Sequence, residues 1–147
     1  FNTLYKAPIN KNFNVGYIIN LGKGSTTAII QSAQDKTITE ISSFIKEFAL
    51  NHLRNQTNPQ ENLDCVFLVT NLASFNSYIV KSPLYENTSS IVSIGSEYDS
   101  IIYTEGTIKP IKEFTITLTY DSRLADCQKA LQFLNSIKNL LEQDPQI

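Results

Sequence analysis

The chain has 147 residues, of which 41% are hydrophobic and 18% charged, and this composition fits one domain with enough apolar side chains for a core. Twelve basic and 14 acidic residues give a net charge of -2 without a long run of either sign, which argues against nucleic acid or an anionic lipid surface as a partner. No apolar stretch approaches the roughly 20 residues that a membrane helix needs, so we expect no membrane insertion. Two cysteines, Cys65 and Cys127, are too few for a disulfide framework and lack a second ligand at metal spacing, so we predict no metal site.

The first half of the chain predicts a β-hairpin followed by an amphipathic helix. Residues 15–21 and 26–30 are rich in β-branched side chains and flank a Gly-Lys-Gly segment, a spacing typical of two strands joined by a tight turn. Thr37 and Glu40 have the spacing of a capping box, which predicts a helix start. Apolar residues then recur every three or four positions, so we predict a helix that ends near Asn55. Its apolar face consists of Ile38, Ile41, Phe44, Ile45, Phe48 and Leu53.

Short strands are expected next. Residues 65–69 form a continuous apolar run, typical of a central strand covered on both faces. Residues 91–94 and 101–104 have strand composition, and Glu105-Gly106 predicts a turn into a strand over 107–109.

The C-terminal part predicts one further strand and one further helix. Apolar residues alternate with threonines over 114–120, the clearest two-residue period in the chain. Residues 127–143 have the spacing of an amphipathic helix, which Pro145 would end. Mixed strands and helices predict an α/β or α+β fold with two layers, a sandwich of helices over a sheet.

The segment between these last two elements reads Leu-Thr-Tyr-Asp-Ser-Arg-Leu-Ala-Asp-Cys over residues 118–127. It resembles the D-H-R-x-x-D-G signature of the lipoamide-dependent acyltransferases and their chloramphenicol acetyltransferase relatives, in which a strand ends before the final helix. Asp121, Arg123 and Asp126 match that signature. Ser122 stands at the histidine position and Cys127 at the glycine position.

The resemblance continues in order along most of the chain. Residues 28–33 are similar to the family's "PIVRNA" strand, residues 65–72 to its "GTFTISNLG" strand, and residues 90–95 to the strand written "AILGVG". The chain departs from the pattern where Ala73 stands for a glycine and where the glycines before the central strand are missing. The resemblance implies a chloramphenicol acetyltransferase-like fold, with a mixed sheet covered by helices. It also implies that residues 1–147 are one core domain that lacks the family's N-terminal part.

The resemblance implies a reaction that depends on the signature histidine. In the family this histidine acts as general base on the thiol of coenzyme A, which then attacks an acyl thioester of dihydrolipoamide. A serine hydroxyl at position 122 cannot accept that proton, and loss of a general base typically costs about 10² to 10⁴ in rate. We therefore expect no catalysis and no resident cofactor, and whether coenzyme A or a lipoyl group still binds is left open.

Four other residues could carry chemistry, and each also has a structural interpretation. His52, the only histidine, is expected as a partly exposed side chain of the first helix. Cys127 could be a nucleophile, but we expect a small buried residue at a helix start. Asp126 is expected to cap the last helix. Thr70 matches the hydroxyl that the family uses to stabilise the oxyanion, and we expect it to be a relic of a degenerate site.

Arg123 and Asp121 have two open interpretations. They could form a salt bridge with each other in solvent. They could also lie at an interface with a neighbouring chain, because the signature segment of the family lies at a subunit boundary.

The resemblance therefore predicts a non-catalytic structural subunit of a 2-oxo acid dehydrogenase complex core, that of pyruvate dehydrogenase being preferred. This would be similar to the family's inactive members, which bind dihydrolipoamide dehydrogenase through additional N-terminal domains. The expected partners are further copies in a homotrimer or active acyltransferase subunits in a hetero-oligomer, in the mitochondrial matrix. Two alternatives stay open: an active acyltransferase that uses coenzyme A with a different base, and a structural subunit adopted by another mitochondrial assembly.

Overall fold

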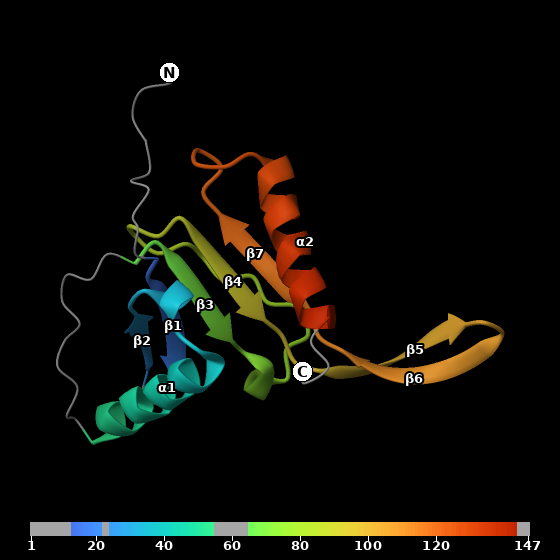
Figure 1. The fold of residues 1–147 in the computed structure, drawn as a ribbon, viewed down its shortest axis with the longest axis horizontal. Coiled ribbons are helices and arrows are strands. Elements are labelled where there is room, and N and C mark those ends of the chain that lie inside the picture. Colours follow the sequence, from blue (N-terminus) through green and yellow to red (C-terminus); the bar gives the residue numbers. More distant parts are fainter. Residues whose placement is uncertain (1–12, 22–23, 55–64, 144–147) are drawn as a thin grey trace.

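Two helices lie on the same side of a five-stranded mixed sheet, and a two-stranded hairpin projects from one end, in this computed structural model (Figure 1). The structure describes residues 13–21, 24–54 and 65–143. The helices are α1 (Ile38–Leu53) and α2 (Cys127–Gln143), with short 3-10 turns η1 (Ala33–Asp35) and η2 (Ala73–Phe75). The strands are β1 (Val15–Asn20), β2 (Ser25–Ile30), β3 (Phe67–Asn71), β4 (Ser90–Ile94), β5 (Tyr98–Thr104), β6 (Thr107–Glu113) and β7 (Ile116–Tyr120).

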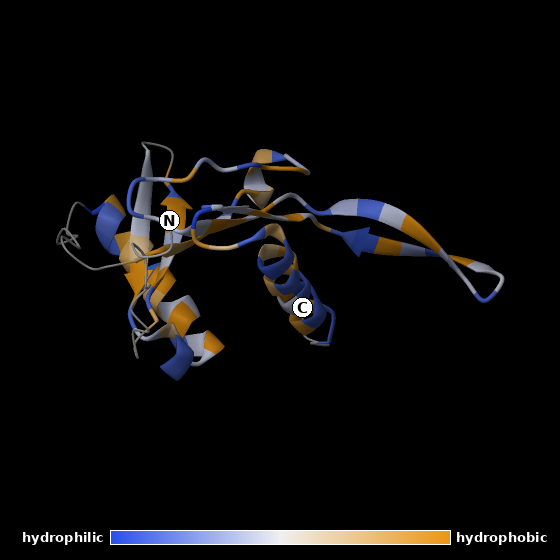
Figure 2. Cartoon of the chain, turned by 90° about the horizontal axis from the view of Figure 1, so that it is seen from above, coloured by the Kyte–Doolittle hydropathy of each residue, from blue (hydrophilic) through white to orange (hydrophobic). Residues whose placement is uncertain are grey.

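The sheet has the strand order β2-β1-β3-β4-β7, which places β3 at its centre as predicted. β3 is parallel to both β1 and β4, whereas the two edge strands β2 and β7 are antiparallel to their neighbours. The hairpin β5–β6 forms a separate two-stranded sheet. In the view turned by 90°, both helices lie on one side of the sheet (Figure 2). The predicted arrangement of two layers is therefore confirmed.

The structure confirms the predicted hairpin of β1 and β2 and the predicted start of α1. β1 and β2 pair from Val15↔Ile30 to Asn20↔Ser25, which confirms the hairpin. The capping box is also confirmed, because the Glu40 amide donates to Thr37 Oγ1 at 3.2 Å and the Thr37 amide donates to Glu40 Oε2 at 2.7 Å. The predicted helix end at Asn55 lies outside the described residues, and α1 itself ends at Leu53.

The central strand is displaced from its predicted bounds. It begins at Phe67 instead of Cys65, because pairing with both β1 and β4 starts at Phe67, and it extends to Asn71. Cys65 instead turns its thiol to the Phe67 carbonyl at 3.2 Å. Half-burial raises the pKa of this thiol and so disfavours its reactive thiolate form.

The later strands also differ in length from the prediction, while the last helix does not. β5 and β6 are longer than expected, because their pairing continues from Thr104↔Thr107 back to Tyr98↔Glu113. β7 is shorter than predicted and begins at Ile116, where pairing with β4 starts. α2 has the predicted bounds, and Pro145 lies outside the described residues.

The apolar stripe of α1 is covered only in part. No residue of α1 is buried, and Ile38 and Leu53 at its two ends are 79% and 59% exposed. The buried apolar residues come mostly from the sheet: Ala28, Ile30, Leu68, Ile91, Val92 and, from α2, Ala130. No helix among the described residues is long and apolar enough to cross a membrane.

Candidate functional site

The turn between β7 and α2, residues 121–126, holds the signature residues and is named here the signature turn. The Asp121 carboxylate accepts hydrogen bonds from the Arg123 backbone amide at 2.9 Å, from Nε at 2.9 and 3.0 Å, and from Nη2 at 2.5 Å. These bonds from Arg123 lower the pKa of Asp121 from 3.8 to about 2. The ion pair therefore forms within the chain. The Arg123 side chain is nevertheless 83% exposed, which leaves room for a neighbouring chain, and a contact of that kind stays a prediction.

Ser122 and Asp126 have different surroundings in this turn. Ser122 is exposed and lies between the two members of the ion pair. The Asp126 Oδ1 atom accepts a hydrogen bond from the Lys129 amide at 2.8 Å, in the third residue of α2, as an N-cap side chain does. This bond is the main cause of the lowered pKa of Asp126.

Cys127 corrects one expectation. It is exposed, not buried, although it lies three residues before the buried Ala130 on the same helical stripe. The stripe is covered only further along the helix, and in its first turn the thiol lies beside the Tyr120 hydroxyl. The pKa of Tyr120 is raised, mainly by burial and to a smaller extent by the neighbouring Cys127 and Asp126.

Thr70 belongs to a row of hydroxyl side chains across the centre of the sheet. Thr70 pairs with Ser93 and Ser93 with Thr117, and residues in one row of a sheet point to the same face. Thr70 and Ser93 are 4% and 1% exposed. Ser93 shares a hydrogen bond of 2.8 Å with Ser82, and Thr117 donates to the Val80 carbonyl, so the connection between β3 and β4 covers this hydroxyl row.

The structure does not bring Thr70 and Ser122 together within one chain. The row that contains Phe67, Ser90 and Tyr120 lies three residues from Thr70, a distance of roughly 10 Å along the strands. Ser122 lies two residues beyond Tyr120 in the opposite direction. Phe67 also packs on Phe133 of α2, with ring centroids 5.6 Å apart, so Phe67 faces the helices whereas Thr70, three residues on, faces the other side.

His52 is also remote from the signature turn. It lies in the last turn of α1, half-buried, with its ring stacked on Phe48 at 6.3 Å. α1 packs beside β2 at one edge of the sheet, whereas the signature turn follows β7 at the other edge (Figure 1). Among the residues that the structure describes, no three His, Cys, Asp or Glu side chains cluster in a way that could hold a metal ion.

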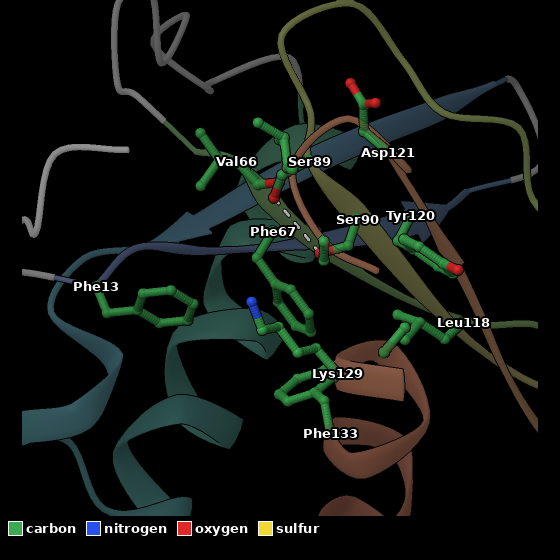
Figure 3. Close-up of a pocket in the computed structure, with 13 residues that line it drawn as sticks. Phe13, Val66, Phe67, Ser89, Ser90, Leu118, Tyr120, Asp121, Lys129 and Phe133 are labelled. Carbon is green, nitrogen blue, oxygen red and sulfur yellow. Dashed lines mark hydrogen bonds between the residues drawn. The ribbon is translucent and has the colours of Figure 1, made fainter. Parts of the chain in front are cut away.

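A pocket of about 290 Å³ lies between α2 and the ends of β3, β4 and β7, and no motif in the sequence indicated it. Figure 3 shows Phe67 and Phe133 pointing toward each other in it, while Asp121 points away. Of the described residues that line the pocket, only Asp121 and Lys129 are charged, and none is a histidine or cysteine. The described lining of the pocket is thus mostly apolar. From the sequence, Phe67 and Phe133 were predicted only as residues of a strand and a helix.

Comparison with known proteins identifies the chain's relatives. Residues 5–147 match the model of the 2-oxoacid dehydrogenases acyltransferase family (catalytic domain). Among curated proteins, the chain is 30% identical over 132 residues to the dihydrolipoyllysine-residue succinyltransferase component of the 2-oxoglutarate dehydrogenase complex of Buchnera aphidicola. That match covers 90% of this chain and 31% of the relative, so the chain spans about a third of the length of this relative.

Solved structures share the fold. A dihydrolipoamide acetyltransferase of Azotobacter vinelandii, whose catalytic mechanism was investigated through a serine, a histidine and an asparagine, superposes with a TM-score of 0.82 at 14% identity. The cubic core of a pyruvate dehydrogenase multienzyme complex gives the same TM-score and identity. Each match covers 90% of this chain and 55% of the other. The predicted mixed sheet covered by helices is therefore confirmed.

Proposed function

We propose that this chain, which belongs to the 2-oxoacid dehydrogenase acyltransferase family (catalytic domain), is a non-catalytic structural subunit of a 2-oxo acid dehydrogenase complex core. One observation carries the proposal: Ser122 occupies the position of the signature histidine. The study of the Azotobacter relative concerns a histidine in the catalytic mechanism of that protein, and the proposal equates that histidine with the signature histidine of the family.

The chemistry of the signature turn favours loss of turnover. A thiol with a pKa near 8.5 is mostly protonated at neutral pH, so a base must remove its proton before it attacks a thioester. The serine hydroxyl has no such basicity. Asp121 is engaged with Arg123, and its pKa of about 2 makes it a weak base. Asp126 caps α2 and has a lowered pKa as well.

The fold could nevertheless serve assembly without the reaction. The ion pair of Asp121 and Arg123, the cap at Asp126 and the hydroxyl row all have structural roles that need no catalytic base. The solved cubic core is an assembly built from a domain of this fold. We extend such an assembly to this chain as part of the proposal, with further copies or active acyltransferase subunits as partners. Contact with dihydrolipoamide dehydrogenase and a location in the mitochondrial matrix are proposals that rest on the resemblance alone.

A second candidate function is an active acyltransferase with another base, favoured by the enzyme name of the Buchnera relative. In this case a group other than Ser122 would take the proton. Within one chain, His52 lies too far from the signature turn for that role.

An assay of acyl transfer from acyl-dihydrolipoamide to coenzyme A separates the two functions. We expect the purified chain to form no acyl-coenzyme A above the rate without protein, while an active member of the family gives turnover in the same assay. A mixture with active acyltransferase subunits should yield joint complexes in which the rate follows the number of active subunits. Turnover by the chain alone would refute the non-catalytic role, and the variants His52→Gln and Ser122→Ala would then show which group carries it.

A further inference from the structure

The connection between β3 and β4, residues 72–89, contains no regular structure apart from the short turn η2. Connections longer than about 12 to 15 residues without regular structure are uncommon in compact domains, and the ordered ones usually have a function. The first part of this connection, residues 73–82, covers the hydroxyl row and is named here the covering segment. The helices lie on the other side of the sheet (Figure 2), so they do not cover this face.

The covering segment is attached to the sheet through polar contacts and not through an apolar core. None of its residues is buried, and Ile79 is 70% exposed. Ser82 shares a hydrogen bond of 2.8 Å with Ser93 of β4, and the Val80 carbonyl accepts a hydrogen bond from Thr117 of β7. Segments with few buried apolar contacts belong to the low-stability parts of a protein, which open locally while the rest stays folded.

Ser96, which follows β4, holds the other end of the covering segment. Its amide donates to the Ser77 carbonyl and its hydroxyl to the Ala73 carbonyl, both at 2.8 Å. Between these two contacts and Ser82, the ring of Tyr78 packs on that of Tyr98, with centroids 5.5 Å apart. The segment is therefore fastened at a few separate points, and these contacts can break without disturbing the pairing of the strands.

The residues beneath the covering segment are polar and almost fully buried. Thr70 is 4% exposed and Ser93, its partner in the hydroxyl row, is 1% exposed. At this exposure the Thr70 side chain is out of reach of a ligand in solution. A change in the covering segment is therefore needed before Thr70 can contact any other molecule.

We propose that the covering segment is a gate over Thr70: residues 73–82 open together while the sheet stays folded, and only the open form presents the Thr70 hydroxyl to solvent. The inference goes beyond the proposed function, because it requires neither acyl transfer nor assembly. A threonine hydroxyl can donate one hydrogen bond, so the open form suits a ligand with a carbonyl or another acceptor oxygen. The closed form withholds that donor.

Hydrogen exchange of the unaltered chain, followed by NMR, tests the gate without any substitution. The Ser96 amide donates to the covering segment, whereas β3 pairs with a strand on each side. We expect the Ser96 amide to exchange at least about 10-fold faster than amides in the middle of β3, with little dependence on low urea concentrations, because local opening exposes little surface. One common rate with the same urea dependence would mean that the segment opens only on global unfolding, which overturns the proposal.

Thiol labelling tests whether opening exposes position 70. In the variant Thr70→Cys, N-ethylmaleimide labels position 70 only when the reagent reaches it, and the exposed Cys127 gives the rate of an open thiol in the same molecule. By mass spectrometry of peptides, we expect labelling at position 70 to be at least about 10-fold slower than at Cys127 and at least about 10-fold faster than global unfolding. A rate equal to that of Cys127 would show that nothing closes over position 70, and a rate equal to that of global unfolding would show that no gate exists.

A further substitution in the Thr70→Cys variant tests the contact that holds the gate closed. Ser82→Ala removes the bond to Ser93, which exists only in the closed form, so labelling at position 70 should become about 5-fold faster. Ser74→Ala, at an exposed serine of the same segment, is the matched control and should leave the rate unchanged. Equal rates in the two variants would refute the gate. Acyl transfer by the unaltered chain would refute the non-catalytic role and leave these rates as they are, so the two proposals fail independently.

Discussion

The hydroxyl row and the signature turn both carry side chains of the kinds that catalysis uses. They differ in burial and in how far along the chain their hydrogen-bond partners lie. Thr70 and Ser93 of the row are buried, and its bonds reach residues far along the chain, as from Thr117 to Val80. The signature turn is largely exposed, and its bonds join residues two or three positions apart, as from Arg123 to Asp121 and from Lys129 to Asp126.

This difference explains how a catalytic position can change without loss of the fold. A residue in the row packs against the segment that covers the sheet and bonds to it, so its replacement disturbs packing and hydrogen bonds together. Ser122 is exposed in a turn that its neighbours hold in place, so its identity matters little for stability. Three variants test this contrast.

The largest effect is expected from Gly95→Ala, beside the row. A Cβ atom at Gly95 would lie 2.2 Å from the Tyr78 carbonyl oxygen and 3.0 Å from that of Ser77, so the covering segment would have to move. We expect a loss of about 2 to 3 kcal/mol in the free energy of unfolding, measured by urea denaturation. The exposed Ser74→Ala serves as the control. A loss under about 0.5 kcal/mol would mean that the connection between β3 and β4 can move to make room, so that the row is not rigidly enclosed.

A smaller effect is expected from Thr117→Val, which keeps the shape of the side chain. It removes the donor to the Val80 carbonyl and should cost about 1 to 2 kcal/mol, again in urea. Thr119→Val, two residues further along the same face of β7, is the matched control and should be close to neutral. Equal effects at the two positions would remove the distinction between the row and the rest of the strand.

The smallest effect on stability is expected from Arg123→Gln in the signature turn. Loss of the guanidinium should return the pKa of Asp121 from about 2 toward 3.8, as followed by NMR titration of its carboxyl carbon. Since the folded-state pKa is the lower one, the ion pair stabilises the fold above about pH 4, and this contribution disappears as the pH falls through about 2. Lys138→Gln, which removes the exposed pair with Glu142, should leave the titration of Asp121 unchanged. An unaltered Asp121 pKa in Arg123→Gln would show that the turn is held by other groups.

Local signals in the sequence were sufficient for several elements of the fold. The capping box at Thr37, the stripe of α2 and the turn at Glu105-Gly106 each depend on residues a few positions apart, and the structure confirms all three. The start of β3 depends on its pairing with β1 and β4, which its own apolar run does not encode. The same holds for the extent of β5 and β6.

The sequence indicates candidate site residues but not their geometry. The order of residues 121–127 indicated the signature and its missing histidine. The separation of Thr70 from Ser122 follows from strand register and from the face to which each residue points, and neither can be read from a motif. Exposure of Cys127 depends on where the sheet stops covering α2, so the general expectation of a small buried residue at a helix start was wrong here.

The turn at the tip of the hairpin has a consequence for the conformational entropy of the two strands. Glu105 and Gly106 both have positive φ, 52° and 80°, as in the type I′ turn whose twist matches that of the paired strands. Thr107 Oγ1 also donates to the Thr104 carbonyl at 2.9 Å across this turn. The turn thus holds the ends of the two strands in their paired geometry. Binding at the tip would therefore cost little further conformational entropy.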